Sequence, residues 1–162
     1  MIIENKLNKI FEQLPEIGGF KPIYHFGDDL EFNKFILTSK KSVYPLIWQI
    51  IKKEIDEDYS ERTITDLEFF IAVRNTETDM FNTIRWETSY KNILNPLYDN
   101  IKTALKESGI IKSDWKFTKY KRPNYSQYDN KEKNKTIDII DVIEFSLKDV
   151  EIKDSCINKI TF

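Results

Sequence analysis

Carboxylates are the side chains in this 162-residue sequence that come nearest to a catalytic pattern. Asp66 and Glu68 lie two residues apart in RTITDLEFFIAV, and Asp138 and Asp141 lie three apart in TIDIIDVIEF. Because side chains alternate across a strand, the first two share one face and the second two point to opposite faces. A Mg²⁺-dependent nuclease would need such acids to converge with a lysine, for which Lys119 is the candidate. We keep that alternative and interpret the acids as solvent-facing groups on half-exposed strands.

Nitrogen and sulfur ligands are nearly absent, since His25 and Cys156 are the only histidine and cysteine. Structural zinc usually takes four such ligands, and Ser-His-Asp catalysis would have to use His25 without a GxSxG turn. Gly18 and Gly19 stand alone, with none of the flanking pattern of a phosphate-binding loop. The sequence therefore predicts no metal, no cofactor and no enzymatic activity.

A basic segment is the remaining candidate for a functional site. Residues 112–135 contain eight Lys or Arg and three Asp or Glu, and tyrosines are interleaved with the cations. Such a segment can contact a protein partner, bind nucleic acid through phosphates and stacked bases, or remain a solvated loop. The candidate partner-contact residues are Lys119, Lys121, Arg122, Tyr125, Tyr128, Lys131, Lys133 and Lys135.

A strand, a turn and a helix between Arg62 and Gly109 are expected to organise the fold. The strand alternates, with one apolar face and an opposite face that is polar at Asp66 and Glu68 and then apolar. The helix predicted from Thr83 onward carries one apolar stripe at steps of three and four, which we interpret as core from Trp86 onward. Pro96 lies inside the helix and should kink it.

The remaining elements are predicted to be mainly strands around this unit. Residues 1–14 form a short amphipathic helix, and FKPIYHFGDDLEFNKFILT has the pattern of a hairpin turning at Gly27. Residues 43–51 read as a strand covered on both faces, with Pro45 at its start or on an edge. Strands at 115–121 and 136–152 complete an α+β fold, a single mainly antiparallel sheet crossed by one long helix, with a short N-terminal helix.

Residues 1–162 are expected to form one domain, with an extended loop at about 122–136 and a loose C-terminal tail at about 154–162. The net charge of −2 gives no reason to expect nucleic acid or a membrane as the main partner. One cysteine and the lack of a long apolar run predict a soluble chain made in the cytoplasm. Several strands are apolar on both faces, more than two helices can cover, so we expect other copies to complete the sheet.

Four stretches of the sequence resemble the tail-completion family of tailed bacteriophages, which includes tail terminators and ring-forming head–tail connectors. They are Tyr44–Trp48, Phe69–Val73, Arg85-Trp86 and Ser89–Leu97, together with the order of elements along nearly the whole chain. The resemblance implies a structural virion protein that forms a ring of sixfold or twelvefold symmetry at the head–tail junction or in the tail. It implies contacts with portal, connector or tail proteins, with DNA passing only transiently through the lumen.

The long loop would be the arm that reaches a neighbouring ring or the lumen. A strongly basic loop would grip DNA rather than let it slide, so we expect the arm to contact protein. Two other classes remain open, namely the metal-dependent nuclease and a monomeric adaptor that binds a partner by adding a strand to its sheet edge.

Overall fold

Strands form a single mixed sheet at the centre of the computed structural model, which describes residues 3–38, 43–51, 56–57, 63–75, 82–123, 125 and 139–162. The main path of the sheet is β1-β2-β4-β7-β5, while β3 pairs with β4 and β6 with β7. Only the β1–β2 pair is parallel among the pairs in these ranges. The bounds are β1 Ile23–Gly27, β2 Leu46–Ile50, β3 Asp56–Glu57, β4 Thr63–Asn75, β5 Ile111–Lys112, β6 Phe117–Arg122 and β7 Ile139–Ile152.

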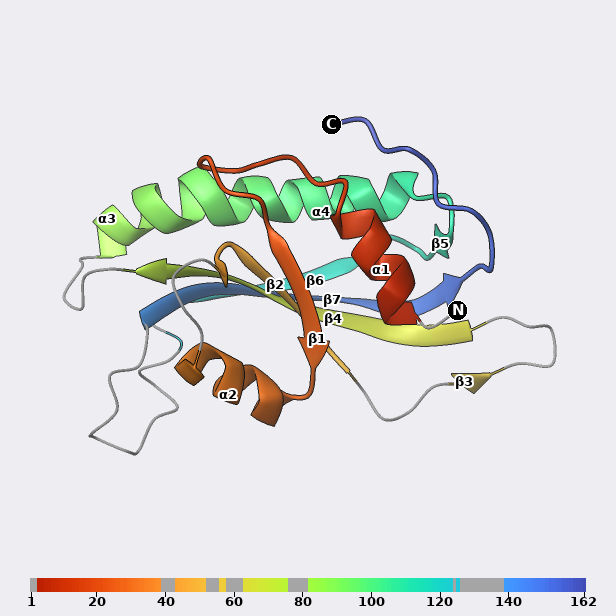
Figure 1. Ribbon diagram of the computed structural model, residues 1–162, viewed down its shortest axis with the longest axis horizontal. Coiled ribbons are helices and arrows are strands. Elements are labelled where there is room, and N and C mark those ends of the chain that lie inside the picture. Colours follow the sequence, from red (N-terminus) through yellow and green to blue (C-terminus); the bar gives the residue numbers. More distant parts are fainter. Residues whose placement is uncertain are drawn as a thin grey trace.

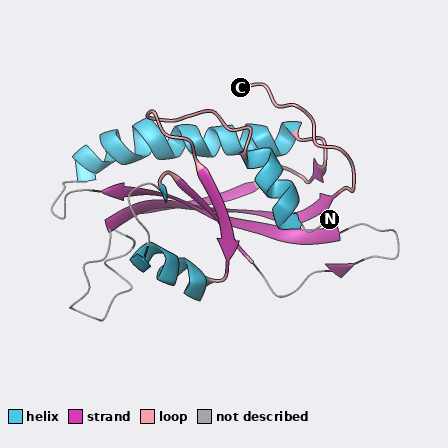
Figure 2. Cartoon of the chain, in the orientation of Figure 1, coloured by secondary structure: helices cyan, strands magenta, loops and turns pink. Residues whose placement is uncertain are grey.

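Helices lie on both faces of this sheet (Figures 1 and 2). A continuous long helix spans one face and consists of α3 (Asn82–Arg85), a π-helical segment η2 (Trp86–Leu94) and α4 (Asn95–Glu107). The short helix α1 (Ile3–Phe11) lies on the same side, and α2 (Asp29–Thr38) lies on the opposite side. The predicted α+β class, with a mainly antiparallel sheet, a long helix and a short N-terminal helix, is confirmed.

The larger core fills the space between the sheet and the long helix. Strand β4 contributes its odd-numbered apolar residues, β7 pairs with it over most of its length, and α1 closes one end of this core. Edge-to-face and stacked rings, such as Phe11 on Phe69 and Phe69 on Phe145, pack at its centre. The alternation in β4 therefore gives the buried face that the sequence predicts.

The second face is covered by α2, where the sequence predicted the second strand of a hairpin. That prediction is wrong because Asp28 and Glu31 form a capping box: Glu31 N–H donates to Asp28 Oδ1 at 2.8 Å and Asp28 N–H to Glu31 Oε2 at 3.2 Å. The helix that follows packs Phe32 and Ile36 over the apolar half of the face, including Phe70. Each face of the sheet thus has its own core.

The long helix differs from the prediction in its register. Asn95 N–H donates to Tyr90 O, a π-type bond, just before Pro96, which lies in the first turn of α4 and has no N–H to donate. Because a π-segment has more residues per turn, the buried line in it runs through Arg85, Tyr90 and Leu94. Trp86 is turned outward and is 49% exposed, so its predicted place in the core is wrong.

The C-terminal segment lies along α1 and the end of α4. Asn158 N–H donates to Ser108 O, Ile160 N–H donates to Gln13 Oε1, and the side chain of Ile160 is buried. Gly109, at φ +75°, makes the left-handed turn that ends the helix there. The segment expected to be loose is therefore bound to the body of the domain.

Candidate functional site

The predicted partner-contact residues that the structure describes lie on β6 and directly after it. They are Lys119, Lys121, Arg122 and Tyr125, while the other four, Tyr128, Lys131, Lys133 and Lys135, lie outside the described residues. Successive residues of β6 alternate between the two faces of the sheet. The strand therefore divides its cations between the two faces of the sheet, with Lys119 and Lys121 on one and Arg122 on the other.

Two lysines of β6 point toward the long helix. Lys119 Nζ donates to Asn95 Oδ1 at 3.2 Å and lies 4.1 Å from the centre of the Tyr98 ring. Lys121 Nζ lies 3.6 Å from the centre of the Trp86 ring. Burial lowers the pKa of both ammonium groups, and the nearby charge of Lys121 lowers the pKa of Lys119 further. These cations bind aromatic rings within the chain.

Arg122 and Tyr125 belong to the other face. Arg122 Nε lies 2.6 Å from Glu144 Oε2, and the Tyr125 ring packs against Phe32 and Phe70 in the core under α2. This packing partly buries Tyr125 and leaves less of its ring available to stack on a nucleic-acid base. On this strand, Tyr120 is the aromatic residue that is well exposed, at 57%.

The described acids proposed for a nuclease, Asp66 and Glu68, do not converge with Lys119. Glu68 lies on the face opposite Lys119, because Lys119 is paired with Phe145, whose ring is in the core under the long helix. Asp66 Oδ1 accepts a bond from Asp149 N–H at 3.0 Å, and Asp138 lies outside the described residues. No group of three metal-ligating side chains occurs in the part of the chain that the structure describes.

A buried polar cluster that the sequence did not suggest joins the start of the long helix to β4 and β7. Arg85 Nε lies 3.1 Å from Asp141 Oδ1, and Asn75 Nδ2 donates to Asp141 Oδ2. Ser89 Oγ donates to Asn75 Oδ1 at 3.0 Å. Arg85 and Asp141 are 1% and 0% exposed, so this pair is closed to solvent and fixes the helix on the sheet.

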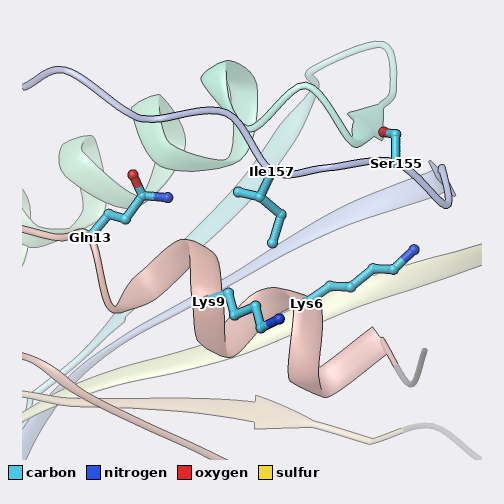
Figure 3. A pocket seen from close by; sticks show the side chains of 5 residues that line it. All are labelled: Lys6, Lys9, Gln13, Ser155 and Ile157. Carbon is cyan, nitrogen blue, oxygen red and sulfur yellow. The ribbon is translucent and has the colours of Figure 1, made fainter.

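A hollow of about 340 Å³ lies between α1 and the C-terminal segment (Figure 3). Its lining is Lys6, Lys9, Gln13, Ser155 and Ile157. Lys6 Nζ donates to Lys153 O at 2.8 Å and pairs with Asp154 at 2.9 Å, so the better buried of the two ammonium groups already has partners. We interpret the hollow as the seam where the C-terminal segment binds α1.

Both lateral edges of the sheet are open within the described ranges. Strand β1 is hydrogen-bonded to β2 alone and β6 to β7 alone. Ile23 N–H donates to Pro45 O and Ile51 N–H to Gly27 O, so the odd residues of β1 bond to β2. The backbone groups of Tyr24 and Phe26 therefore face outward along the β1 edge.

An aromatic hollow adjoins the β1 edge on the face that carries α2. It has a volume of about 340 Å³ and is lined by Phe26, Phe35 and Trp48, with Glu31, Lys34 and Thr38 at its polar side. Phe26, a large apolar side chain on this edge strand, is 48% exposed. The β1 edge and this aromatic hollow form the surface of the described chain best suited to receive another polypeptide.

The chain matches no protein-family model, and no curated protein is significantly similar to it. In the described ranges no helix combines the length and the apolar character needed to cross a lipid bilayer.

Proposed function

We propose that this protein is a structural virion component of a tailed bacteriophage, a ring-forming connector or tail terminator at the head–tail junction or in the tail. The sequence resemblance is the basis of the proposal, together with the α+β architecture that the pattern of elements predicted. The observation that carries it is the single sheet, both of whose edges are open among the described strands, because a subunit with one edge on each side can join identical neighbours on both sides. The subunit has no catalytic role in this proposal.

The reason for self-assembly differs from the one that the sequence suggested. The sequence pointed to apolar sheet faces left bare, but α2 covers the apolar half of the second face. Within the described residues, the surfaces that remain open are instead the outward backbone donors and acceptors of the edge strands, together with exposed aromatic side chains beside them. Strand edges of this kind are normally covered by another element or another chain.

The nuclease alternative loses its support from the described residues, because Glu68 and Lys119 lie on opposite faces. The arrangement favours contact between proteins over chemistry on a nucleic acid. The partners expected from the resemblance remain part of the proposal. They are neighbouring portal, connector or tail proteins, with DNA in only transient contact and no membrane.

Deleting the gene from the phage or prophage that encodes this chain tests the function. We expect separate heads and tails, or tails of irregular length, in electron micrographs, and restoration of joined particles by the wild-type gene supplied in trans. Normal numbers of infectious particles without the protein would contradict the proposal.

A further inference from the structure

We propose that copies of this chain join head to tail by continuing the sheet, with the β6 edge of one copy antiparallel to the β1 edge of the next and Tyr120 seated in the aromatic hollow. The inference rests on the proposed function only in assuming that the protein assembles with itself. The occupant of the aromatic hollow is therefore a second copy of this chain.

Strand directions make the pairing antiparallel. Strand β1 is parallel to β2, and the pairs β2–β4, β4–β7 and β7–β6 are each antiparallel. Three reversals leave β6 running opposite to β1 within one subunit. When the next subunit keeps the same orientation, its β1 lies antiparallel to the first subunit's β6, which is the more stable kind of pair.

Side-chain positions on the two edges agree with this pairing. Tyr120 pairs with Glu144 and so lies on the face opposite the core under the long helix, which is the face that carries α2. The aromatic hollow lies on that same face of the sheet, beside β1. A sheet that continues from β6 into β1 keeps Tyr120 and the aromatic hollow on one side, and it covers Tyr120, which is exposed in the isolated subunit. Phe26 alternates with His25 along β1, so its side chain lies on the other face of the sheet, beside Tyr24.

Charge favours a head-to-tail contact over a symmetric one. Residues 115–123 carry four cations and no acid, whereas residues 26–31 carry three acids and no Lys or Arg. Antiparallel pairing brings Lys116, before β6, to the acidic turn after Gly27. A β6–β6 contact would instead set cations against cations, which is destabilising. A contact between two different edges generates rings or filaments.

Two variants that each block one edge test the inference. Phe26→Pro removes an outward N–H that β2 does not use, and Phe26→Ala is its control because it retains that N–H. Tyr120→Glu would place a carboxylate in the aromatic hollow near Glu31, and Asn92→Glu adds the same charge on the exposed side of the long helix. Circular dichroism and thermal melting show whether each variant folds like the wild type.

Analytical ultracentrifugation at up to millimolar concentration gives the result. We expect the wild type, Asn92→Glu and Phe26→Ala to form oligomers larger than a dimer, and Phe26→Pro and Tyr120→Glu each to remain monomeric. A mixture of the two blocked variants should form one-to-one dimers, because each retains the edge that the other has lost. Dimer formation also shows that neither variant failed merely because it misfolded.

Three outcomes would overturn the inference. Oligomers formed by either blocked variant alone would place the interface elsewhere, and a mixture that stays monomeric would show that these edges do not pair. A wild type that is monomeric at the highest concentration would also show that these edges do not pair with each other. The β1 edge would then have to bind a different protein. The gene deletion tests the proposed function separately. If the copies join through another surface, the deletion still removes the ring and its phenotype still appears, while the edge variants do not prevent assembly.

Discussion

Removing the charge of Asp141 should cost more stability than removing any other carboxylate charge in the described part of the chain. Asp141 is fully buried and lies 3.1 Å from Nε of Arg85, which is itself 1% exposed. Nη1 and Nη2 of Arg85 have no hydrogen-bond partner among the described residues, so Asp141 provides its closest compensation. Asp141→Asn would leave a buried cation uncompensated, which typically costs about 3–5 kcal/mol. Out of a total stability of about 5–15 kcal/mol, this is a large fraction.

Urea denaturation followed by tryptophan fluorescence measures this loss, and equal slopes in the wild type and the variants validate the comparison. Arg85→Met together with Asp141→Leu removes both charges and should cost less than Asp141→Asn alone, because no buried charge is left unpaired. Glu87→Gln is the matched control, since Glu87 pairs with Lys91 at 2.8 Å on the exposed helix surface and should change stability by only about 0.3–0.5 kcal/mol. A loss below about 1 kcal/mol for Asp141→Asn, or a double variant as costly as the sum of its single variants, would refute the reasoning.

Three further predictions concern single elements. Trp86→Ala should cost less than about 2 kcal/mol in urea denaturation, because the ring is half-exposed and loses only its contacts with Lys121 and the Tyr90 ring. A loss of about 4 kcal/mol would show that Trp86 is a core residue. Burial lowers the pKa of His25, so the unfolded chain binds a proton at this residue more readily than the folded chain does. The free energy of unfolding should therefore fall as the pH is lowered from about 7 to about 5. His25→Gln should lessen that fall, and a variant with the same pH profile as the wild type would contradict the prediction. Asp28→Ala should destabilise the domain by about 1 kcal/mol through loss of the capping box, whereas the exposed neighbour variant Asp29→Ala should not, as the same denaturation curves will show.

The elements with strong periodicity could be predicted from the sequence. The two-sided character of strand β4, with a polar half near Glu68 and an apolar half at Phe70, was readable from alternation alone. Pro45 was expected at a strand start or on an edge, and it directly precedes β2, which begins at Leu46. These features depend on side-chain order within one segment, so no distant partner is needed to infer them.

Helix α2 could not be assigned from periodicity, because LEFNKFILT fits a strand and a helix about equally well. Its capping box was nevertheless present in the sequence as Asp28 and Glu31, and giving that signal more weight would have corrected the prediction. The sequence carried no comparable signal that Arg85, and not Trp86, is the residue on the buried side of the long helix. It follows from the π-segment before Pro96, which a stripe with a period of 3.6 residues does not reveal.

The correction at α2 changes what kind of assembly the molecule can form. Bare sheet faces would favour stacking of two sheets, which tolerates many orientations and is often symmetric. Once α2 and the long helix cover the faces, the strongest unsatisfied groups of the described chain lie along β1 and β6, where hydrogen bonding fixes both direction and spacing. These two edges differ in charge, so in the proposed contact between copies each subunit uses one edge and leaves the other for the next copy. In the proposed head-to-tail assembly, the rotation between neighbours decides whether the copies close into a ring and how many copies that ring holds, or whether they continue as a filament.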